Sequence, residues 1–236
     1  MLDIQKLNVY IMGMHIIKGI SMQIKEGEFV SFIGANGAGK STLMRSIIGL
    51  QEVNSGVISL NGESLNGQRA DVICQKRIAL VPEGRRLFGE MSVEENLEMG
   101  AFSYRKDTAR IKKNLQKMYD LFPVLEQYKH RTARTFSGGE QQMITISRGL
   151  MSEPRILLVD ELSLGLAPKV VTMLLEVLKR LNEKEGIGIL LVEQNAAQAL
   201  RYSQRGYVLD NGRVTLEGAS DELINDPEVR KAYVGI

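Results

Sequence analysis

The chain has 236 residues, of which 44% are hydrophobic and 25% charged, a profile typical of a globular protein with a substantial core. The formal net charge is +2, which gives no electrostatic reason to expect a nucleic-acid partner. Cys74 is the single cysteine, so an intrachain disulfide is excluded, and no apolar run approaches the ~18–20 residues that a membrane-spanning helix needs. Because the first residues also lack a cleavable signal pattern, we expect a cytoplasmic protein.

The first third of the chain reads as β-structure interrupted by a helix. Apolar runs separated by turn residues predict strands at 7–10, 20–24, 29–33, 56–60 and 78–82. A helix is expected after the third of these strands, at about 42–48, with Gly49 at its end. Asn61 and Gly62 predict a tight turn after the fourth strand.

Between the third strand and the helix lies a loop that reads G-x-x-x-x-G-K-S. Strand, glycine loop and helix in this order are the context in which the P-loop pattern is specific. Glycines let backbone N–H groups approach phosphate oxygens, and the helix start adds its positive dipole end. Lys40 would bring a charge to the outer phosphates, and Ser41 would offer its hydroxyl to Mg²⁺. The predicted ATP-binding residues in this segment are Gly34, Ala35, Asn36, Gly37, Ala38, Gly39, Lys40, Ser41 and Thr42.

The middle of the chain changes character at about residue 90. Glycines become rarer, and Ile111, Leu115 and Met118 recur at helical spacing. We therefore expect a helical subdomain at about 90–151, inserted into a single domain of 1–236 whose core lobe comprises about 1–89 and 152–236.

Strands and helices alternate again in the last third. Continuous apolar runs predict strands at 156–160 and 187–192, the first of a kind buried on both faces, with helices at 168–184 and 196–202. Asn211 and Gly212 predict a hairpin over 207–216, and short helices are expected at 220–224 and 227–234. The alternation of strands and helices predicts an α/β fold.

Two acidic residues follow the apolar strand at 156–160, namely Asp160 at its end and Glu161 after it. We expect this strand beside the P-loop strand, where Asp160 can hold Mg²⁺ through water. Glu161 is placed to polarise an attacking water. Alone, the two acids could simply be solvated in a loop, but the upstream P-loop favours a role in nucleotide hydrolysis.

A second glycine-containing helix start precedes these acids. Ser137 can cap a helix over 138–151, and Gly138 and Gly139 would expose N–H groups to an anion. An ordinary glycine-containing helix cap is the alternative. The position of the segment just before the Asp160 strand favours phosphate binding.

The P-loop, the sequence Ser137-Gly138-Gly139-Glu140-Gln141 and the pair Asp160-Glu161 together resemble the ATPase subunit of ABC transporters, over essentially the whole chain. The resemblance implies a RecA-like core, an N-terminal antiparallel β lobe and the helical insertion. It also implies that two such subunits sandwich two ATP molecules with Mg²⁺. Each P-loop would then face the signature of the partner, which in this chain is formed by Ser137, Gly138, Gly139 and Glu140.

Three further segments make the chain similar to the branched-chain amino acid import branch of that family, of the LivF type. Glu83 stands where most members carry Gln, the segment 163–168 replaces the usual Ser-Ala-Leu-Asp-Pro, and Gln194 replaces a usual His. Gln194 could bond the γ-phosphate or a water but cannot carry a proton charge, which leaves Glu161 as the main base. Glu83 could accept at Mg²⁺ or its water. Leu162 stands at the family's usual proline.

The resemblance leaves the adenine contact open. Tyr10 is the predicted aromatic for stacking, but Ile11 could occupy the family's aromatic position, and Tyr10 could equally be a packing residue at a strand end. Further along, Arg85, Arg86 and Phe88 resemble the family's segment that contacts a short helix of the membrane subunit. Surface charge with one core Phe is the alternative for those three.

The resemblance implies an importer ATPase, peripheral on the inner face of the cell membrane, whose nucleotide-driven dimer closure powers two permease subunits. A mixed pair with a sister ATPase is expected, with a homodimer as the alternative, and an extracytoplasmic solute-binding protein would act indirectly. Two other functions compete. A soluble ABC-type ATPase acting on a non-transport partner would usually carry fused cassettes or a long coiled-coil insertion, and a module without turnover would lack Lys40 or Glu161. The chain shows none of these departures.

Overall fold

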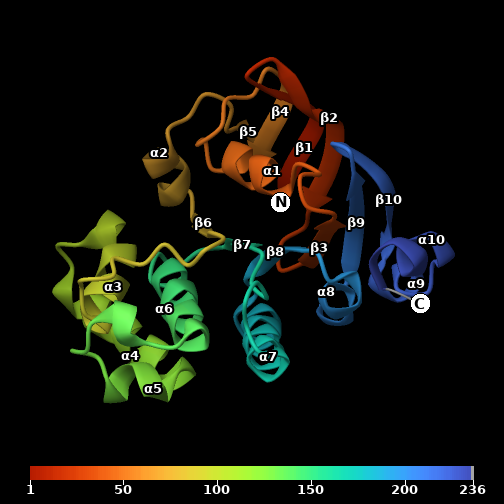
Figure 1. Ribbon diagram of the computed structural model, residues 1–236. Coiled ribbons are helices and arrows are strands. Elements are labelled where there is room, and N and C mark those ends of the chain that lie inside the picture. The colour runs from red at the N-terminus through yellow and green to blue at the C-terminus, as the bar shows by residue number, and fades with distance from the viewer. Residues whose placement is uncertain (235–236) are drawn as a thin grey trace.

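The computed structural model describes residues 1–234 and contains two β-sheets surrounded by helices (Figure 1). The N-terminal sheet has the strand order β2-β1-β4-β5, and the central sheet has the order β10-β9-β3-β8-β7-β6. The strands of the N-terminal sheet are β1 (Leu2–Ile11), β2 (Met14–Ile24), β4 (Ser55–Leu60) and β5 (Glu63–Ser64). Those of the central sheet are β3 (Phe29–Gly34), β6 (Ile78–Val81), β7 (Ile156–Asp160), β8 (Gly188–Glu193), β9 (Arg205–Asp210) and β10 (Arg213–Ala219).

The N-terminal sheet is antiparallel, and β1 lies between β2 and β4. Leu2 pairs with Ile24 of β2 on one side and with Leu60 of β4 on the other. The register of β1 against β2 is interrupted three times, once between Val9 and Tyr10. Because a bulge absorbs an extra residue while pairing continues beyond it, both strands run further than the predicted 7–10 and 20–24.

The central sheet is mostly parallel. β3 pairs in parallel with β8 and with β9, β8 with β7, and β7 with β6, whereas β10 is antiparallel to β9. Every residue of β3, β7 and β8 is buried, as expected for parallel strands covered on both faces. The prediction that the Asp160 strand lies beside the P-loop strand is wrong, because β8 lies between β3 and β7. A strand that comes later in the chain is inserted between two earlier ones.

Two hydrophobic cores cover the two faces of the central sheet. Val30 and Phe32 of β3 belong to the core shared with the N-terminal sheet, α1 and α2, whereas Phe29 and Ile33 belong to the core shared with α3 to α10. The alternation follows from the two-residue repeat of a strand. The helices are α1 (Lys40–Ile47), α2 (Ala70–Gln75), α3 (Val93–Gly100), α4 (Thr108–Leu121), α5 (Pro123–Gln127), α6 (Gly138–Leu150), α7 (Pro168–Glu185), α8 (Ala196–Tyr202), α9 (Ser220–Leu223) and α10 (Pro227–Val229), with 3-10 turns η1 (Phe102–Tyr104) and η2 (Ala133–Thr135) and a π-turn η3 (Arg230–Val234).

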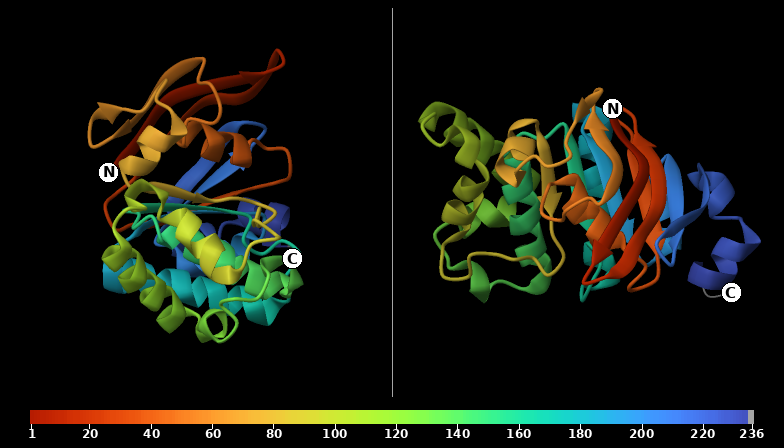
Figure 2. Two further views of the ribbon diagram at one scale, coloured as in Figure 1. Left: turned by 90° about the vertical axis from the view of Figure 1, so that its left-hand side faces the viewer. Right: turned by 90° about the horizontal axis from the view of Figure 1, so that it is seen from above.

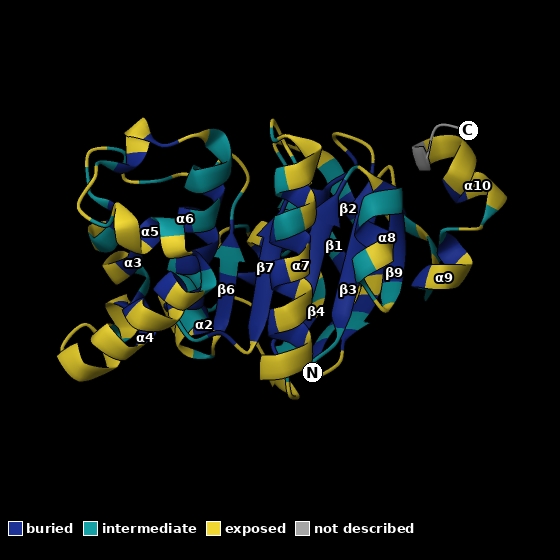
Figure 3. Cartoon of the chain, turned by 90° about the horizontal axis from the view of Figure 1, so that it is seen from below, coloured by how far each residue is buried: buried dark blue, intermediate teal, exposed yellow. Residues whose placement is uncertain are grey.

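Helices α3 to α6 gather at the β6 edge of the central sheet, and α9 and α10 at the β10 edge (Figure 2). α7 and α8 cover one face of the sheet with exposed outer surfaces (Figure 3). The segment at about 90–151 contains α3 to α6. Its buried residues belong to the same hydrophobic core as Phe29 and Ile33 of β3. Within residues 1–234 we find no helix with the length and apolar character needed to cross a bilayer.

Candidate nucleotide-binding site

The P-loop connects β3 to α1 along a path that only glycine permits at two points. Gly37 and Gly39 have φ values of 78° and 110°. A Cβ added at Gly39 would lie 2.9 Å from Cδ1 of Ile17 and 3.3 Å from the carbonyl oxygen of Ile16, so a larger residue would crowd β2. α1 begins at Lys40, and no side chain of the described residues caps it. The first N–H groups of α1 can therefore serve an anion.

A cleft of about 510 Å³ opens at this loop. Three groups of residues line it: aliphatic side chains from β1 and β2, the P-loop with the start of α1, and the loops after β6, β7 and β8. In that order, the lining residues are Ile11, Met14 and Ile16, then Asn36, Gly37, Gly39, Lys40, Ser41 and Thr42, then Glu83, Glu161, Leu164 and Gln194. The fold thus brings the predicted catalytic residues and Glu83 to the P-loop.

The ammonium group of Lys40 is fully engaged within the chain. Lys40 is 4% exposed, and its Nζ donates to the carbonyls of Gly34 at 2.9 Å and Ala35 at 3.0 Å. Nζ also forms an ion pair with Oε1 of Glu161 at 3.1 Å. Three N–H donors thus face three acceptors. Lys40 can reach a phosphate only by exchanging a partner, and exchanging Glu161 would also release a carboxylate.

Glu161 is held at both carboxylate oxygens. Oε1 contacts Lys40, and Oε2 accepts a hydrogen bond of 2.9 Å from Nε2 of Gln194. β7 and β8 run in parallel register, so the residues that follow them meet at one edge of the sheet. The backbone of Glu161 has a φ of 47°, a strained value of the kind that clusters at functional sites. The arrangement places a candidate general base beside an amide that orients it.

Ser41 and Asp160, two of the predicted metal residues, are in contact although β8 lies between β7, which ends at Asp160, and β3, which leads to the helix that carries Ser41. Oγ of Ser41 donates to Oδ1 of Asp160 at 3.4 Å. Burial, helped by nearby Glu161 and Glu83, raises the pKa of Asp160 to about 6 against the hydrogen bond from Ser41. Mg²⁺ takes oxygen ligands and is usually held by one or two carboxylates together with phosphates. The hydroxyl and carboxylate present here fit that ion.

Tyr10 is not among the residues that line the cleft. Its ring stacks on His15 with the ring centroids 4.2 Å apart and an interplanar angle of 9°. The neighbouring Ile11 lines the cleft instead, as the alternative reading of the sequence allowed. The role of Tyr10 in adenine stacking stays a prediction that the position of its side chain does not support.

The signature segment caps α6 and lies outside the cleft. Oγ of Ser137 accepts from the backbone N–H of Glu140, and Oε2 of Glu140 accepts from the N–H of Ser137 at 2.8 Å, which completes a capping box. Nη2 of Arg85 would lie 3.0 Å from a Cβ added at Gly138, so the glycine makes room for the guanidinium. The binding of a partner's nucleotide by this segment stays a prediction.

Sequence reasoning missed two contributions to the site. The aliphatic wall includes Met14 and Ile16, which a strand pattern does not distinguish from core residues. Glu193 is 2% exposed at the end of β8, and burial raises its pKa. Its carboxylate accepts from the N–H of Ser163 at 2.9 Å and from Oγ of Ser163 at 2.7 Å. The available signal was an acidic residue at the end of an otherwise apolar buried strand.

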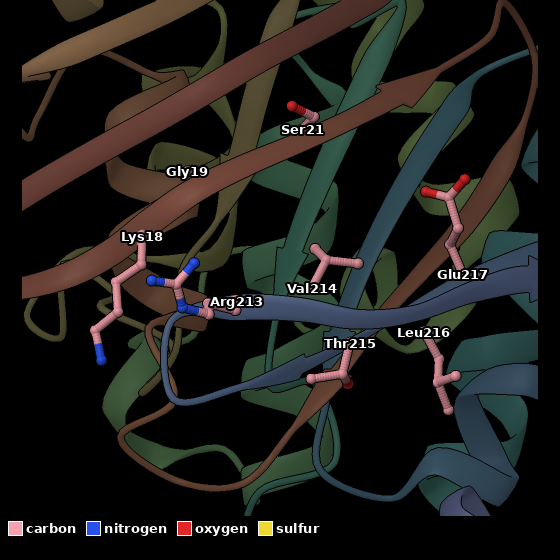
Figure 4. A pocket seen from close by; sticks show the side chains of 8 residues that line it. All are labelled: Lys18, Gly19, Ser21, Arg213, Val214, Thr215, Leu216 and Glu217. Atoms are coloured by element: carbon pink, nitrogen blue, oxygen red, sulfur yellow. The ribbon is translucent and has the colours of Figure 1, made fainter.

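Two further hollows lie away from this cleft. A groove of about 530 Å³ runs between α2, β6, α3 and α6, and Phe88, Met99 and Phe102 on its lining are 46%, 40% and 60% exposed. A hollow of about 380 Å³ lies between β2 and β10, with Lys18 and Arg213 at one end and Glu217 at the other (Figure 4). None of the predicted site residues lines the second hollow.

Fold and cleft together define a P-loop nucleotide-binding protein, and comparisons with known proteins specify which kind. Residues 17–163 match the ABC transporter family. The chain is 45% identical over 235 residues to the high-affinity branched-chain amino acid transport ATP-binding protein BraG of Pseudomonas aeruginosa, with 100% of both chains covered. It is 34% identical to a protein of Archaeoglobus fulgidus named as the branched-chain amino acid transport ATP-binding protein LivF, with 100% of this chain and 99% of that one covered.

A solved structure agrees with these relatives. The dimeric ATP-binding cassette MJ0796, in a post-hydrolysis state bound to ADP and Pi, matches with a TM-score of 0.81 and 29% identity, over 93% of this chain and 99% of that one. The chain belongs to the ABC transporter family and is an ATP-binding, ATP-hydrolysing subunit. The predicted family and the predicted fold class are confirmed.

Proposed function

We propose that this chain is the ATPase subunit of an importer for branched-chain amino acids. The observation that supports hydrolysis is that Lys40, Glu161 and Gln194 line one cleft together with Ser41, which bonds to the buried Asp160 behind it. The solute class follows from BraG and LivF, whose names give branched-chain amino acid transport. The alternative, a soluble ATPase acting on a non-transport partner, has no observation in its favour.

The P-loop and Lys40 bind the phosphates of ATP in this proposal. The uncapped N–H groups at the start of α1 take phosphate oxygens, and Nζ of Lys40 turns from Glu161 to the outer phosphates. Mg²⁺, when bound, supplies positive charge that neutralises the phosphate oxygens. Ser41 and Asp160 would hold that ion, with Glu83 reaching it through a water.

Glu161 acts as the general base. When Lys40 turns to the phosphates, Oε1 of Glu161 loses its cationic partner and can accept a proton from water. Gln194 keeps the carboxylate oriented through Oε2 and gains or loses no proton itself. ATP binding and the release of the base are therefore one event, since both need the same ion pair to open.

A second ATPase subunit completes the site. None of the signature residues lines the cleft of their own chain, which agrees with a role towards another copy or a sister ATPase. The dimeric form of MJ0796 supports such a pair. We propose a mixed pair, with a homodimer as the alternative. In a mixed pair, Ser137→Arg would impair turnover mainly at the partner's nucleotide.

Two membrane permeases are the proposed further partners, and their docking surface is the groove between α2, β6, α3 and α6. Its exposed aromatic residues Phe88 and Phe102 would be covered on docking, and Arg86 lies on the same lining. Two of the three residues predicted to contact the membrane subunit, Arg86 and Phe88, line this groove, whereas Arg85 does not. Docking would hold the subunit at the inner face of the cell membrane, with an extracytoplasmic binding protein delivering solute.

Reconstitution tests the proposal directly. The chain, its sister ATPase, the two permeases and the binding protein would be assembled in proteoliposomes and supplied with labelled leucine. Uptake that requires ATP and is abolished by Glu161→Gln is the expected result. ATP hydrolysis without uptake of any branched-chain amino acid would overturn the solute class, and a preference of the purified chain for ribosomes or DNA over permeases would overturn the transport role.

A further inference from the structure

Glu193 connects two loops of the nucleotide cleft without lining it. It is the last residue of β8 and immediately precedes Gln194. Its two carboxylate oxygens accept from one residue, Ser163, which lies in the loop after β7: Oε1 from the N–H at 2.9 Å and Oε2 from Oγ at 2.7 Å. With 2% exposure, Glu193 has little access to water that could replace these bonds.

The loop that Glu193 holds begins next to the candidate base. Glu161 precedes Ser163 by two positions, and the N–H of Leu164 bonds back to the carbonyl of Glu161 at 3.4 Å. Leu164 also lines the cleft. On the far side of Glu193, Gln194 donates to Glu161. The carboxylate of Glu161 and the loop that follows it are therefore fixed from one short segment, Glu193 and Gln194.

We propose that Glu193 is a positioning residue for ATP hydrolysis, which holds the loop after Glu161 through Ser163 and so fixes the base against the γ-phosphate. The inference rests on the proposed function of the cleft. Glu193 touches neither nucleotide nor water in the reaction. A base displaced by about 1 Å loses on the order of 10²-fold in rate, so small shifts of this loop matter to turnover rather than to binding.

Steady-state phosphate release by the assembled ATPase complex is the measurement, with the Kd for ATP and the melting temperature of each variant. Glu193→Ala removes both acceptors and lowers kcat by about tenfold or more, while KM for ATP stays within about twofold. Glu193→Gln keeps an acceptor for the Ser163 N–H and can donate from Nε2 to Oγ, so it recovers most of the rate. Ser163→Ala keeps the N–H bond and has a smaller effect than Glu193→Ala.

A double-mutant cycle on kcat tests whether Glu193 acts through Ser163. If Glu193 acts through Ser163, the double variant is no slower than Glu193→Ala alone. Glu95→Ala is the matched control, because Glu95 also accepts from the N–H and Oγ of one serine, Ser92, but at the start of α3. It should leave kcat unchanged.

The outcomes distinguish this inference from the proposed function. An unsubstituted complex without ATP turnover would overturn the proposed function itself. An active complex in which Glu193→Ala keeps kcat within about twofold would overturn only the role of Glu193, as would losses from Glu193→Ala and Ser163→Ala that simply add. If Glu193→Ala does not fold, Ser163→Ala decides, and an unchanged kcat in that variant overturns the inference.

Discussion

α1 follows a glycine-containing loop and α6 begins with two glycines, yet the two helices satisfy their first N–H groups in opposite ways. α1 has no capping side chain among the described residues, and its first residue, Lys40, turns back to the carbonyls of Gly34 and Ala35. α6 is closed by a capping box between Ser137 and Glu140. An uncapped helix start can be stabilised by an anion that binds there, whereas a capping box already gives two of the N–H groups at the start a partner within the chain.

The difference indicates which of the two starts serves the chain's own nucleotide. The α1 start lies in the cleft with Glu161 and Gln194, so its N–H groups and Lys40 are available to phosphates once the ion pair opens. At α6, an incoming phosphate would have to compete with the carboxylate of Glu140. The first site should bind ATP without help, and the second should engage it only within a closed pair.

The largest expected effect is a loss of turnover at the cleft where α1 begins. Glu161→Gln should lower kcat by about 10³-fold, because an amide is a poor base. ATP affinity should not fall, since the substitution removes the carboxylate that competes for Lys40. Phosphate release and isothermal titration measure the two quantities. Glu183→Gln, on the exposed face of α7, is the control. Near-parental turnover of the Glu161 variant would contradict the role of Glu161 as general base.

Removing the lysine should mainly affect binding. Lys40→Ala deletes a charged donor aimed at phosphate, so the Kd for ATP should rise by about 30-fold, equivalent to about 2 kcal/mol. Isothermal titration with Mg-ATP is the measurement, and Lys112→Ala, an exposed cation of α4, is the control. Near-parental affinity in the Lys40 variant would contradict the comparison of the two helix starts, because α1 would then not be the phosphate site.

The shifted pKa of Asp160 makes the stability of the folded chain depend on pH. Burial raises its pKa from 3.8 to about 6 in the folded chain, so the folded state binds its proton more tightly than the unfolded state does. The protonated carboxyl of Asp160 therefore contributes to the free energy of unfolding. This contribution is fully present below pH 3.8 and is lost as pH rises through about 6. Asp160→Asn should therefore stabilise the nucleotide-free protein at pH 7 by about 1–3 kcal/mol while weakening Mg²⁺-dependent ATP binding.

Urea unfolding at pH 4 and pH 7 checks this expectation, because the gain from Asp160→Asn should shrink at the lower pH. A gain of equal size at both pH values would show that ionisation of Asp160 is not its cause. Asp71→Asn, an exposed carboxylate in α2, provides the comparison.

The smallest expected effect is the loss of stability on removing the cap at the start of α6. Ser137→Ala should reduce the free energy of unfolding by about 1 kcal/mol, the usual value of a helix cap. Ser92→Ala, which removes the same capping box from α3, should cost the same stability. Only Ser137→Ala should lower turnover of the assembled pair. Equal turnover in both variants would leave Ser137 as a cap without a further role.

Local features of this fold could be predicted from the sequence, but the spatial order of the strands could not. The glycine loop, the buried strands predicted at 156–160 and 187–192 and the hairpin at Asn211 all follow from periodicity and turn chemistry. Each of those signals lies within a few residues. That β8 lies between β3 and β7 depends on long-range packing of two faces, which no local pattern encodes.

The site shows the same limit. The sequence predicts one nucleotide site for six residues, and the fold brings all of them close together: Lys40, Ser41, Glu83, Asp160, Glu161 and Gln194. Tyr10, whose role in adenine stacking stays a prediction, lies off the cleft lining, and a register irregularity between Val9 and Tyr10 breaks the alternation of strand faces on which such a choice depends. Glu193 was missed because its partner Ser163 is 30 positions away in the sequence.

The capping box of α6 has a consequence for the proposed pair of subunits. Since Ser137 and Glu140 cap the start of that helix from within the chain, these hydrogen bonds persist when the two subunits separate. In the proposed pair, the start of α6 therefore does not have to form anew each time the subunits meet.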